Sequence, residues 1–495
     1  MRDQLPVILF LVPFATAICL PMVGLKAHGW CRPMALVSLL VMFVLAVGNL
    51  LLVLKHGEQS YGFAGWSASA SPPLGIVWVN DALASVMMVT ISFLASLCLL
   101  YSGPLSPATE KPRIVPYYAL ILLLVSALTG IVFAGDIFNV FVFLEVAALS
   151  AYALVALAGG RALIAAFRYL ILGTLGSTFY LLGVVFFYAT TGTLNMEDIC
   201  QQFTKNPELL HSKAVVGGMA FLFLGLGIKM ALFPLHAWLP GAYTHAPDAI
   251  SPLLAGLMTK VALYGCVRVL FWGLAAGAQT EQLPALTLLG GLGMVAALAG
   301  SLLALAQQEL KRMFAYGGIS HIGLILIGVS QANQTAFAGS MFYLMNDAIM
   351  QAGLFFIAGA AIQHHGARTV ADLSRLRRAP WLVTAFIALA LSMIGIPPTG
   401  GFFGKWHIIL GCLEAENYLA VTAIVVSTLL TMAYFQRLFL SMFGHREVVP
   451  DSAAGALAPS TKLAVGLTAL LVVVLGLCSE PLISIFRETA AGVGL

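Results

Sequence analysis

Charged side chains are scarce in this sequence. Asp, Glu, Lys and Arg make up 9% of its 495 residues, whereas hydrophobic residues make up 60% and the mean hydropathy is +0.98. About a quarter of the residues of an ordinary soluble domain are charged, so this composition excludes an ordinary soluble enzyme. It is typical of a membrane protein that crosses the bilayer many times.

Motifs for metal, nucleotide and nucleophile chemistry are also missing. The seven cysteines form no CxxC pair, which argues against a disulfide framework and against a zinc or iron–sulfur site. His364 and His365 are adjacent, and the patterns HExxH, GxxxxGK[ST] and GxSxG do not occur. We therefore expect no metal and no cofactor, and the sequence carries no catalytic motif of an enzyme. Any transport must be driven by an ion gradient or by a partner protein.

Long apolar runs make up most of the chain, and each is near the ~20 residues that span a bilayer. Fourteen such segments can be read, at about 5–24, 34–55, 79–101, 114–134, 137–158, 163–190, 214–240, 249–273, 284–306, 313–330, 336–362, 381–411, 418–443 and 463–486. The first is long enough to span, so we interpret it as a helix and not as a signal peptide. The sequence predicts a single all-α membrane domain over residues 1–495.

Basic residues are unequally divided between the loops of the two sides. With the N-terminus outside, the odd-numbered loops hold fifteen Lys and Arg residues, including Arg168, Lys311 and Arg437, and the even-numbered loops hold four, including Arg268. Lys and Arg collect on the cytoplasmic side of membrane proteins. The sequence therefore predicts a cytoplasmic (inner) membrane location in a bacterium or archaeon, with both termini outside. The net charge of +4 reflects this topology and does not imply nucleic acid.

Two lysines lie within lipid-length segments in the middle of the chain. Lys229 is followed five residues later by Pro234, which breaks a helix, and in lipid such a break is tolerated only beside protein or a hydrated cavity. Lys260 lies well inside segment 249–273, where a charge costs ~2.5–3.5 kcal/mol unless it faces the bundle interior. The alternative is that both lysines snorkel to the membrane surface. Their depth favours an ion pathway.

A second broken segment lies at 381–411, where Pro397 and Pro398 interrupt the apolar run and Lys405 follows. Paired breaks in the two halves of a membrane protein indicate inverted repeats. The repeats would be five-helix units at 114–273 and 284–443, of opposite orientation because five is odd. The alternative is a loop between two short helices.

Glu145 is the only acidic residue deep inside segment 137–158. A lone carboxylate is costly in low-dielectric surroundings, whereas a nearby ammonium stabilises its charge, and Lys229 is the natural partner. A pair whose attraction is close to its desolvation cost can be opened by a modest change nearby. We interpret the pair as a switch, the alternative being a static ion pair between two helices.

Further titratable groups lie at membrane depth in other segments. His236 follows Pro234 by two residues, His321 lies in segment 313–330, and Asp347 in segment 336–362 is an acid that can pair with one of the bases. Each could serve structure alone. Together with the lysines, His321 completes a line of protonatable groups, and His236 and Asp347 are accessory candidates.

These motifs, in this order, resemble the antiporter-like membrane subunits shared by multisubunit cation/proton antiporters, complex I and membrane-bound hydrogenases. The resemblance is carried by DIFNVFVFLEVAALSAYALVA, GIKMALFPLHAWLPGAYTHAPDAIS, GLMTKVALYGCVR, ELKRMFAYGGISHIG and PPTGGFFGKW. The stretches LPGAY, LMTKVALYG and PLGIVWVNDALA are most similar to D-type subunits of the sodium/proton antiporters. The resemblance implies that Glu145 and Lys229 form the input pair, that Lys260 is the central relay, and that Lys405 is the terminal proton donor.

The sequence departs from the family pattern at three positions. Gly241 stands where relatives usually carry an acid, Gln351 where they commonly carry lysine, and Asn346 where many carry histidine. If the second half conducts protons, water must then bridge from His321 to Lys405.

We expect a proton-translocating subunit of a hetero-oligomeric membrane complex that conducts protons, with sodium as a second candidate ion. Two hypotheses stay open, a secondary cation/proton antiporter and the proton channel of a redox-driven complex of the hydrogenase or complex I type. A degenerate scaffold subunit is a third, and retention of the charged positions argues against it.

Overall fold

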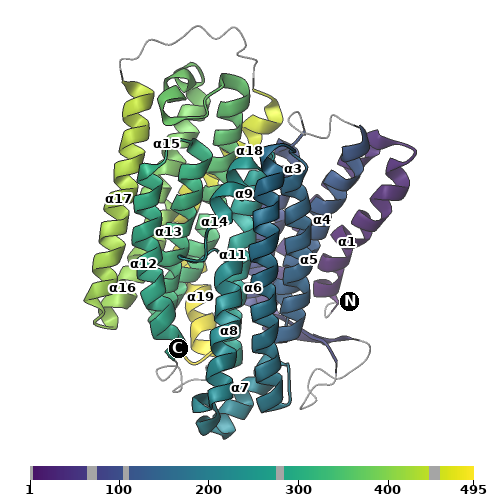
Figure 1. Ribbon diagram of the computed structural model, residues 1–495, viewed down its shortest axis with the longest axis vertical. Coiled ribbons are helices and arrows are strands. Elements are labelled where there is room, and N and C mark those ends of the chain that lie inside the picture. The colour runs from purple at the N-terminus through teal and green to yellow at the C-terminus, as the bar shows by residue number, and fades with distance from the viewer. Residues whose placement is uncertain (1–3, 64–74, 104–110, 275–283, 445–456) are drawn as a thin grey trace.

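The protein is a bundle of long helices in the computed structural model, which describes residues 4–63, 75–103, 111–274, 284–444 and 457–495 (Figure 1). The α-helices are α1 (Leu5–Gly24), α2 (Cys31–His56), α3 (Ala82–Tyr101), α4 (Lys111–Phe133), α5 (Ile137–Ala156), α6 (Arg161–Thr191), α7 (Met196–Lys205), α8 (Lys213–Lys229), α9 (Leu239–His245), α10 (Ile250–Leu253), α11 (Thr259–Arg268), α12 (Pro284–Ala306), α13 (Leu310–Ser330), α14 (Gln334–His365), α15 (Pro380–Ile394), α16 (Gly400–Glu414), α17 (Tyr418–Phe443), α18 (Pro459–Leu477) and α19 (Glu480–Gly492). Short 3₁₀ helices are η1 (His28–Trp30), η4 (Pro207–His211) and η8 (Val370–Arg378), and η5 (Leu254–Met258) and η6 (Val269–Leu274) are π-helical.

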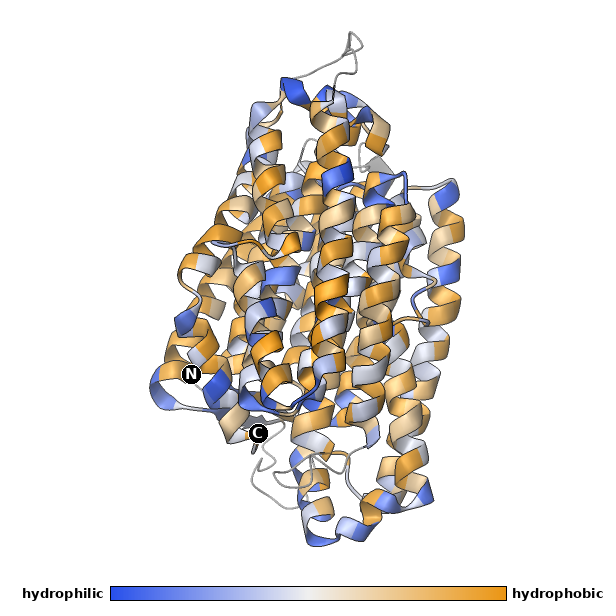
Figure 2. Cartoon of the chain, turned by 90° about the vertical axis from the view of Figure 1, so that its left-hand side faces the viewer, coloured by the Kyte–Doolittle hydropathy of each residue, from blue (hydrophilic) through white to orange (hydrophobic). Residues whose placement is uncertain are grey.

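Within the described residues, twelve helical stretches are long and apolar enough to cross a membrane. Two more crossings are broken, one into α8 and α9 and the other into α15 and α16. Figure 2 shows hydrophobic residues along the length of the helices and hydrophilic residues mainly at the two ends of the bundle. The protein is therefore a multi-pass membrane protein, and the predicted all-α fold of about fourteen crossings is confirmed.

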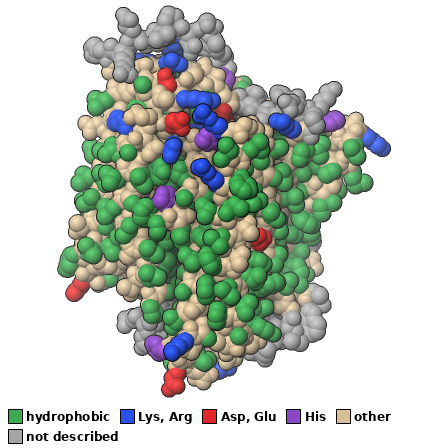
Figure 3. All heavy atoms as spheres, viewed as in Figure 1, with side chains coloured by type: hydrophobic (Ala, Val, Ile, Leu, Met, Phe, Trp, Pro, Cys, Tyr) green, Lys and Arg blue, Asp and Glu red, His purple; other side chains and the backbone are tan. Residues whose placement is uncertain are grey.

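A two-stranded sheet is the exception to the predicted all-helical fold. Strand β1 (Gln59–Gly62) pairs antiparallel with β2 (Val77–Asn80), and the next helix, α3, begins with Asp81 as its N-cap. Both termini lie at the same end of the bundle, the lower end of Figure 1, as an even number of crossings requires. Lys and Arg side chains gather mainly at the opposite, upper end (Figure 3).

Several of the basic residues that are counted with the loops in the charge comparison lie within helices. Arg168 is in α6, Lys311 in α13, Arg437 in α17 and Arg268 in α11. Only Lys311 lies outside the predicted segments, two residues before 313–330, whereas Arg168, Arg268 and Arg437 lie inside predicted segments, within six residues of a segment end, and are counted with the adjacent loops. The asymmetry between the two ends of the bundle remains.

Glycines let two pairs of helices pack closely. A Cβ atom on Gly225 of α8 would lie 2.5 Å from the backbone oxygen of Gly176 in α6, and one on Gly300 of α12 would lie 2.5 Å from the backbone nitrogen of Ser320 in α13. Small residues at such contacts let helix backbones approach each other in membranes. The close packing fixes the distance between α6 and α8 and the distance between α12 and α13.

The N-terminal ends of α5 and α13 are anchored by the same hydrogen-bonding pattern. The start of α5 bonds to the segment that follows α6, and the start of α13 bonds to the segment that follows α14. In each case the first residue of the helix donates its backbone N–H to that segment, and the residue before it forms an antiparallel bridge with the same segment. The hydrogen bonds are Ile137 to Leu194 and Leu310 to Arg368, both 3.0 Å, and the bridges are Asp136 with Asn195 and Glu309 with Thr369.

Candidate functional site

The first ion pair lies where the seventh crossing breaks. Helix α8 ends at Lys229, and the chain then runs irregularly through Pro234 to α9. The indole N–H of Trp238 donates to the carbonyl of Ile228 at 2.8 Å, which satisfies one of the carbonyl groups released at the helix end. The break therefore presents the Lys229 side chain to the bundle interior at a fixed place.

Glu145 of α5 is the partner of this lysine. Its Oε1 lies 3.1 Å from Nζ of Lys229, and Ser177 Oγ donates a hydrogen bond to the same oxygen. The Lys229 side chain is 2% exposed, whereas that of Glu145 is 29% exposed. The structure thus brings the two predicted partners together, and the carboxylate faces out of this chain at membrane depth.

A second cluster joins three crossings at Asp347 of α14. Its Oδ2 lies 2.8 Å from Nζ of Lys260, and its Oδ1 lies 2.7 Å from Nδ1 of His321. The three side chains are at most 3% exposed. Lys260 is the second residue of α11, directly after the π-helical turn η5, a distortion that is frequent at functional sites. The carboxylate therefore sits between two bases.

Lys405 has a different kind of partner. Its Nζ donates to the carbonyl oxygens of Met393 at 2.8 Å and Ile394 at 3.1 Å, which belong to the last turn of α15. The C-terminal end of a helix carries partial negative charge that favours a cation. Lys405 also lines a cavity of about 170 Å³ with Phe402 and Trp406, and the rest of the lining is apolar except for Thr428.

Tyr343 lies between the central cluster and Lys405. Its ring centroid is 5.4 Å from that of His321 and 5.8 Å from Nζ of Lys405, and its hydroxyl oxygen is buried without a hydrogen-bond partner among the described residues. Nothing in the sequence singles this residue out, because a tyrosine within an apolar helix is ordinarily a packing residue.

The remaining candidates lie outside these clusters. The ring of His236 stacks on Phe233 at 5.0 Å and contacts Tyr316 edge-on at 5.9 Å, away from the ion pairs. In α14, the amide of Asn346 donates to Ser392 Oγ at 3.2 Å, and Gln351 Nε2 is buried without a partner among the described residues. Pro397 and Pro398 lie between α15 and α16, so both predicted breaks are present.

Two further buried ion pairs flank the bundle at its ends. At the upper end, Lys311 Nζ lies 2.5 Å from Asp248 Oδ1 and donates to Ser251 Oγ at 3.0 Å. At the lower end, Arg268 Nη1 lies 2.6 Å from Asp81 Oδ2. Both cations are counted with the loops in the charge comparison, whereas the structure places both in helices. The signal that could have found them is their place within two turns of a helix end.

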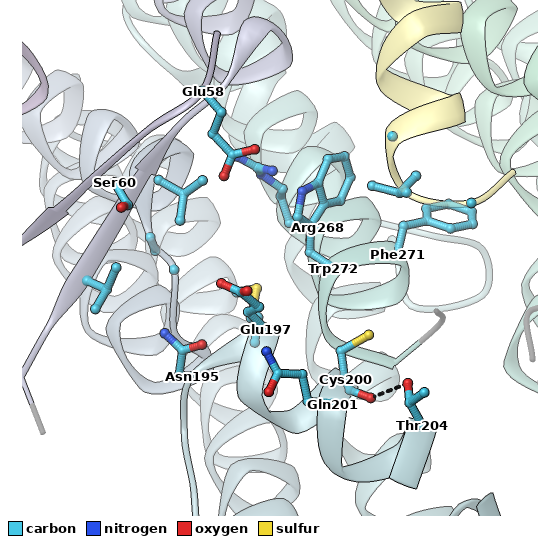
Figure 4. A pocket seen from close by; sticks show the side chains of 18 of the residues that line it. Glu58, Ser60, Asn195, Glu197, Cys200, Gln201, Thr204, Arg268, Phe271 and Trp272 are labelled. Atoms are coloured by element: carbon cyan, nitrogen blue, oxygen red, sulfur yellow. Dashed lines mark hydrogen bonds between the residues drawn. The ribbon is translucent and has the colours of Figure 1, made fainter. Parts of the chain in front are cut away.

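The Arg268 pair borders a cavity of about 770 Å³ at the lower end. In Figure 4 the side chains of Glu58, Glu197 and Arg268 face this cavity, which α7 and the β1–β2 sheet enclose. Burial, together with the neighbouring Asp81 carboxylate, raises the pKa of Glu58 above its ordinary value. The cavity is thus lined by two carboxyl side chains, Glu58 and Glu197, and by the guanidinium of Arg268.

Comparison with known proteins identifies a single family. The family described as "NADH:quinone oxidoreductase/Mrp antiporter, TM" matches residues 134–431. The N-type subunit of the NADH-quinone oxidoreductase from Desulforudis audaxviator is 38% identical, over 98% of each chain. The D-type subunit of the Na(+)/H(+) antiporter from Alkalihalophilus pseudofirmus is 30% identical, over 99% of this chain and 97% of its own.

Solved structures share the fold along the whole chain. A chain of the Mrp complex from Dietzia sp. superposes with a TM-score of 0.88 at 23% identity, covering 100% of this chain and 97% of its own. A chain of the membrane-bound sulfane sulfur reductase, an archaeal respiratory membrane complex, gives a TM-score of 0.88 at 27% identity, covering 99% and 98%. The family match over residues 134–431 includes Glu145, Lys229, Lys260 and Lys405.

Proposed function

The chain belongs to the NADH:quinone oxidoreductase/Mrp antiporter transmembrane family, and on this basis we propose that it translocates protons as one membrane subunit of a multisubunit complex. The observation that carries the proposal is the series of buried ionisable groups, from Glu145 and Lys229 through Lys260, Asp347 and His321 to Lys405. Ionisable groups inside a membrane are expensive, and they mark ion pathways and proton relays.

The geometry of the first pair suits a switch. Glu145 has two hydrogen-bond donors, Lys229 and Ser177, on one oxygen. If the carboxylate moves away from Lys229, the buried ammonium loses its counter-charge and releases its proton towards the interior. The pair re-forms when a new proton arrives, so each opening would move one proton.

The next step would carry the proton through the cluster at Asp347. Lys260 and His321 both contact this carboxylate. A proton that reaches one of the two bases could therefore pass to the other through the carboxylate, over two contacts of 2.8 Å and 2.7 Å. No direct hydrogen bond joins His321 to Lys405 among the described residues. Water in this interval, beside Tyr343, would complete the route to Lys405, whose cavity lies at the second break.

The exposure of Glu145 supports a complex. A carboxylate that is 29% exposed at membrane depth cannot face hydrocarbon without a large desolvation penalty. A neighbouring membrane subunit would cover it and could also open the pair. The structural neighbours in the Mrp and sulfane sulfur reductase complexes are subunits of such assemblies.

Two classes of complex fit the proposal. The relative that belongs to a Na(+)/H(+) antiporter favours an antiporter, in which sodium moves against protons. The relative at 38% identity, which belongs to an NADH-quinone oxidoreductase, favours the proton channel of a redox-driven complex. Genes for small antiporter subunits beside this gene would support the first class, and genes for iron–sulfur subunits the second.

We also infer that residues 114–273 and 284–443 are inverted repeats. We further infer that both termini lie on the outer side of the cytoplasmic membrane. The repeats are supported by the matching anchors of α5 and α13 and by the two broken crossings five segments apart. Arg268 and Arg437, near the ends of corresponding helices, lie at opposite ends of the bundle, as inversion requires. The topology is supported by the basic upper end, opposite the termini (Figure 3).

Proton movement in membrane vesicles tests the proposal. The complex that contains Lys229→Ala should assemble and should lose proton movement, because the charge is removed while the apolar contacts of α8 remain. Lys213→Ala is the matched control, since Lys213 lies at the exposed start of the same helix and should be dispensable. Proton movement at the normal rate in an assembled Lys229→Ala complex would overturn the proposal. A sodium pulse and a redox substrate, applied separately, distinguish the two classes. Proton movement that follows the sodium pulse indicates the antiporter, and proton movement that follows the redox substrate indicates the redox-driven complex.

A further inference from the structure

A basic pocket of about 330 Å³ opens at the upper end of the bundle between α6, α9 and α13. Its polar lining consists of Arg161, Arg168, Arg312, Thr244, His245 and Tyr316. Figure 3 shows basic and histidine side chains on this face around the place where Figure 1 labels α9, above a band of hydrophobic side chains. The ion pairs described above lie elsewhere.

The three arginines of the pocket have no counter-charge in the described part of the chain. The lining includes no carboxylate, and within the described residues the side chains of Arg161, Arg168 and Arg312 form no hydrogen bond or ion pair. By contrast, Arg437 at the same end donates to the backbone oxygen of Leu305 at 2.6 Å. The hydroxyl of Thr244 is buried in the pocket wall and also lacks a partner among the described residues. The pocket therefore offers several free donors and a concentration of positive charge, which fits a phosphate group.

The depth of the pocket places it at the headgroup level. Arg161 is the first residue of α6 and Arg168 follows seven residues later, about 10 Å along the helix axis. On the same helix, Ile164, Phe167 and Ile171 are 59%, 63% and 52% exposed, so an apolar surface leads down from the arginines. A phosphate bound by the arginines would have its acyl chains on that surface. Basic pockets between transmembrane helices on the cytoplasmic side bind anionic lipid headgroups.

We propose that this pocket binds the headgroup of an anionic phospholipid of the cytoplasmic leaflet. The inference of binding rests on the charge and depth of the pocket and not on the proposed transport activity. A lipid accounts for the arginines and for the apolar surface together, whereas a free phosphate ion accounts for the arginines alone.

The bound lipid would also brace the break beside Lys229. Trp238 forms part of the pocket wall, stacks on Tyr169 with ring centroids 4.0 Å apart, and donates to the carbonyl of Ile228 at 2.8 Å. A headgroup in the pocket lies against the wall that the buried Trp238 helps to form, and it therefore restricts the turn that ends α8. This second part rests on the proposed function, and we expect loss of the lipid to slow proton movement without abolishing it.

The test compares lipid binding by two triple variants of the intact complex. The first is Arg161→Gln, Arg168→Gln and Arg312→Gln. The control is Lys26→Gln, Arg378→Gln and Lys462→Gln, which removes the same charge from exposed positions at the same end. Each complex is purified and placed in nanodiscs of phosphatidylcholine with or without phosphatidylglycerol, and the retained lipid is measured by native mass spectrometry.

We expect the wild type and the control to retain phosphatidylglycerol, and the pocket variant to retain at least tenfold less. A pocket variant with all three arginines changed to lysine keeps the charge and should bind measurably, which guards against misfolding as the cause. Equal retention by the wild type and the glutamine variant would overturn the proposal. So would binding of inorganic phosphate in the pocket without retention of phosphatidylglycerol, or cross-linking of Ile164→Cys to another subunit. If binding is lost as expected but proton movement is unchanged, the lipid site stands and only its coupling to the break is wrong.

Discussion

Replacement of Asp347 by asparagine is the sharpest test of the central cluster. The side chain keeps its shape but loses the charge that lies 2.8 Å from Lys260 and 2.7 Å from His321. Removing one partner of a buried ion pair costs about 3–5 kcal/mol, because the other charge is left uncompensated. That is a large share of the ~5–15 kcal/mol by which a typical protein is stable, so assembly must be measured with transport.

We expect Asp347→Asn to reduce proton movement at least tenfold in vesicles loaded with a pH-sensitive dye. Gln351→Ala is the comparison on the same helix, because Gln351 is similarly buried but carries no charge and its Nε2 has no partner among the described residues. It should transport at close to the normal rate. A relay centred on position 351 predicts the opposite order.

A double variant separates a structural role of Asp347 from a role in transport. Asp347→Asn combined with Lys260→Gln removes both charges, so no unpaired ammonium remains, and we expect assembly and thermal stability to recover by most of the lost ~3–5 kcal/mol. Proton movement should stay low, because neither group can then carry or hold a proton. If the double variant assembles and transports at the wild-type rate, the pair is only structural and the proposed route through it is refuted.

The first ion pair, the topology and the N-cap of α5 each offer a further test. Glu145→Gln should lower proton movement about as much as loss of Lys229. Glu145→Asp keeps the charge at a longer distance, so it should lower proton movement less. Equal loss of proton movement in both variants of an assembled complex would contradict the switch. A reporter that is active only in the cytoplasm should be inactive when fused after Leu495, and its activity there would refute the predicted topology. Burial raises the pKa of Asp136, the N-cap of α5, to about 6, so its contribution to stability is present at low pH and is lost as pH rises through about 6. The whole loss is at most about 3 kcal/mol, of which about half falls between pH 5 and 8, and this pH dependence should be absent in Asp136→Asn when unfolding temperatures in detergent are compared at these two values.

The breaks and the first ion pair could be predicted from the sequence because each rests on a local signal. Proline within an apolar run marks a break wherever the helix packs. Glu145 is the only acidic residue deep inside its segment, and Lys229 lies at a helix break, so few ion pairs are possible for either residue. The cost of an unpaired charge in lipid then selects the partner without knowledge of the tertiary structure.

The end pairs and Tyr343 could not be found in the same way. Arg268 and Asp81 are 187 residues apart, and each lies near the end of a predicted apolar segment, where hydropathy gives no reason to pair them. Their pairing depends on how far each helix extends and on which helices are neighbours. The position of Tyr343 depends on the rotation of α14 about its own axis, because only one face of this helix lies between His321 and Lys405.

The contact of Lys405 with the end of α15 makes its charge visible to spectroscopy. Met393, whose carbonyl accepts a hydrogen bond from Nζ at 2.8 Å, is the only methionine in the sequence that is followed by isoleucine. Carbonyl-¹³C methionine combined with ¹⁵N isoleucine therefore labels a single peptide bond in the 495-residue chain. The chemical shift of that one carbonyl carbon reports the strength of the hydrogen bond from Nζ. A resonance at this position would allow the protonation of one buried lysine to be followed in the assembled complex, in a lipid bilayer and during turnover.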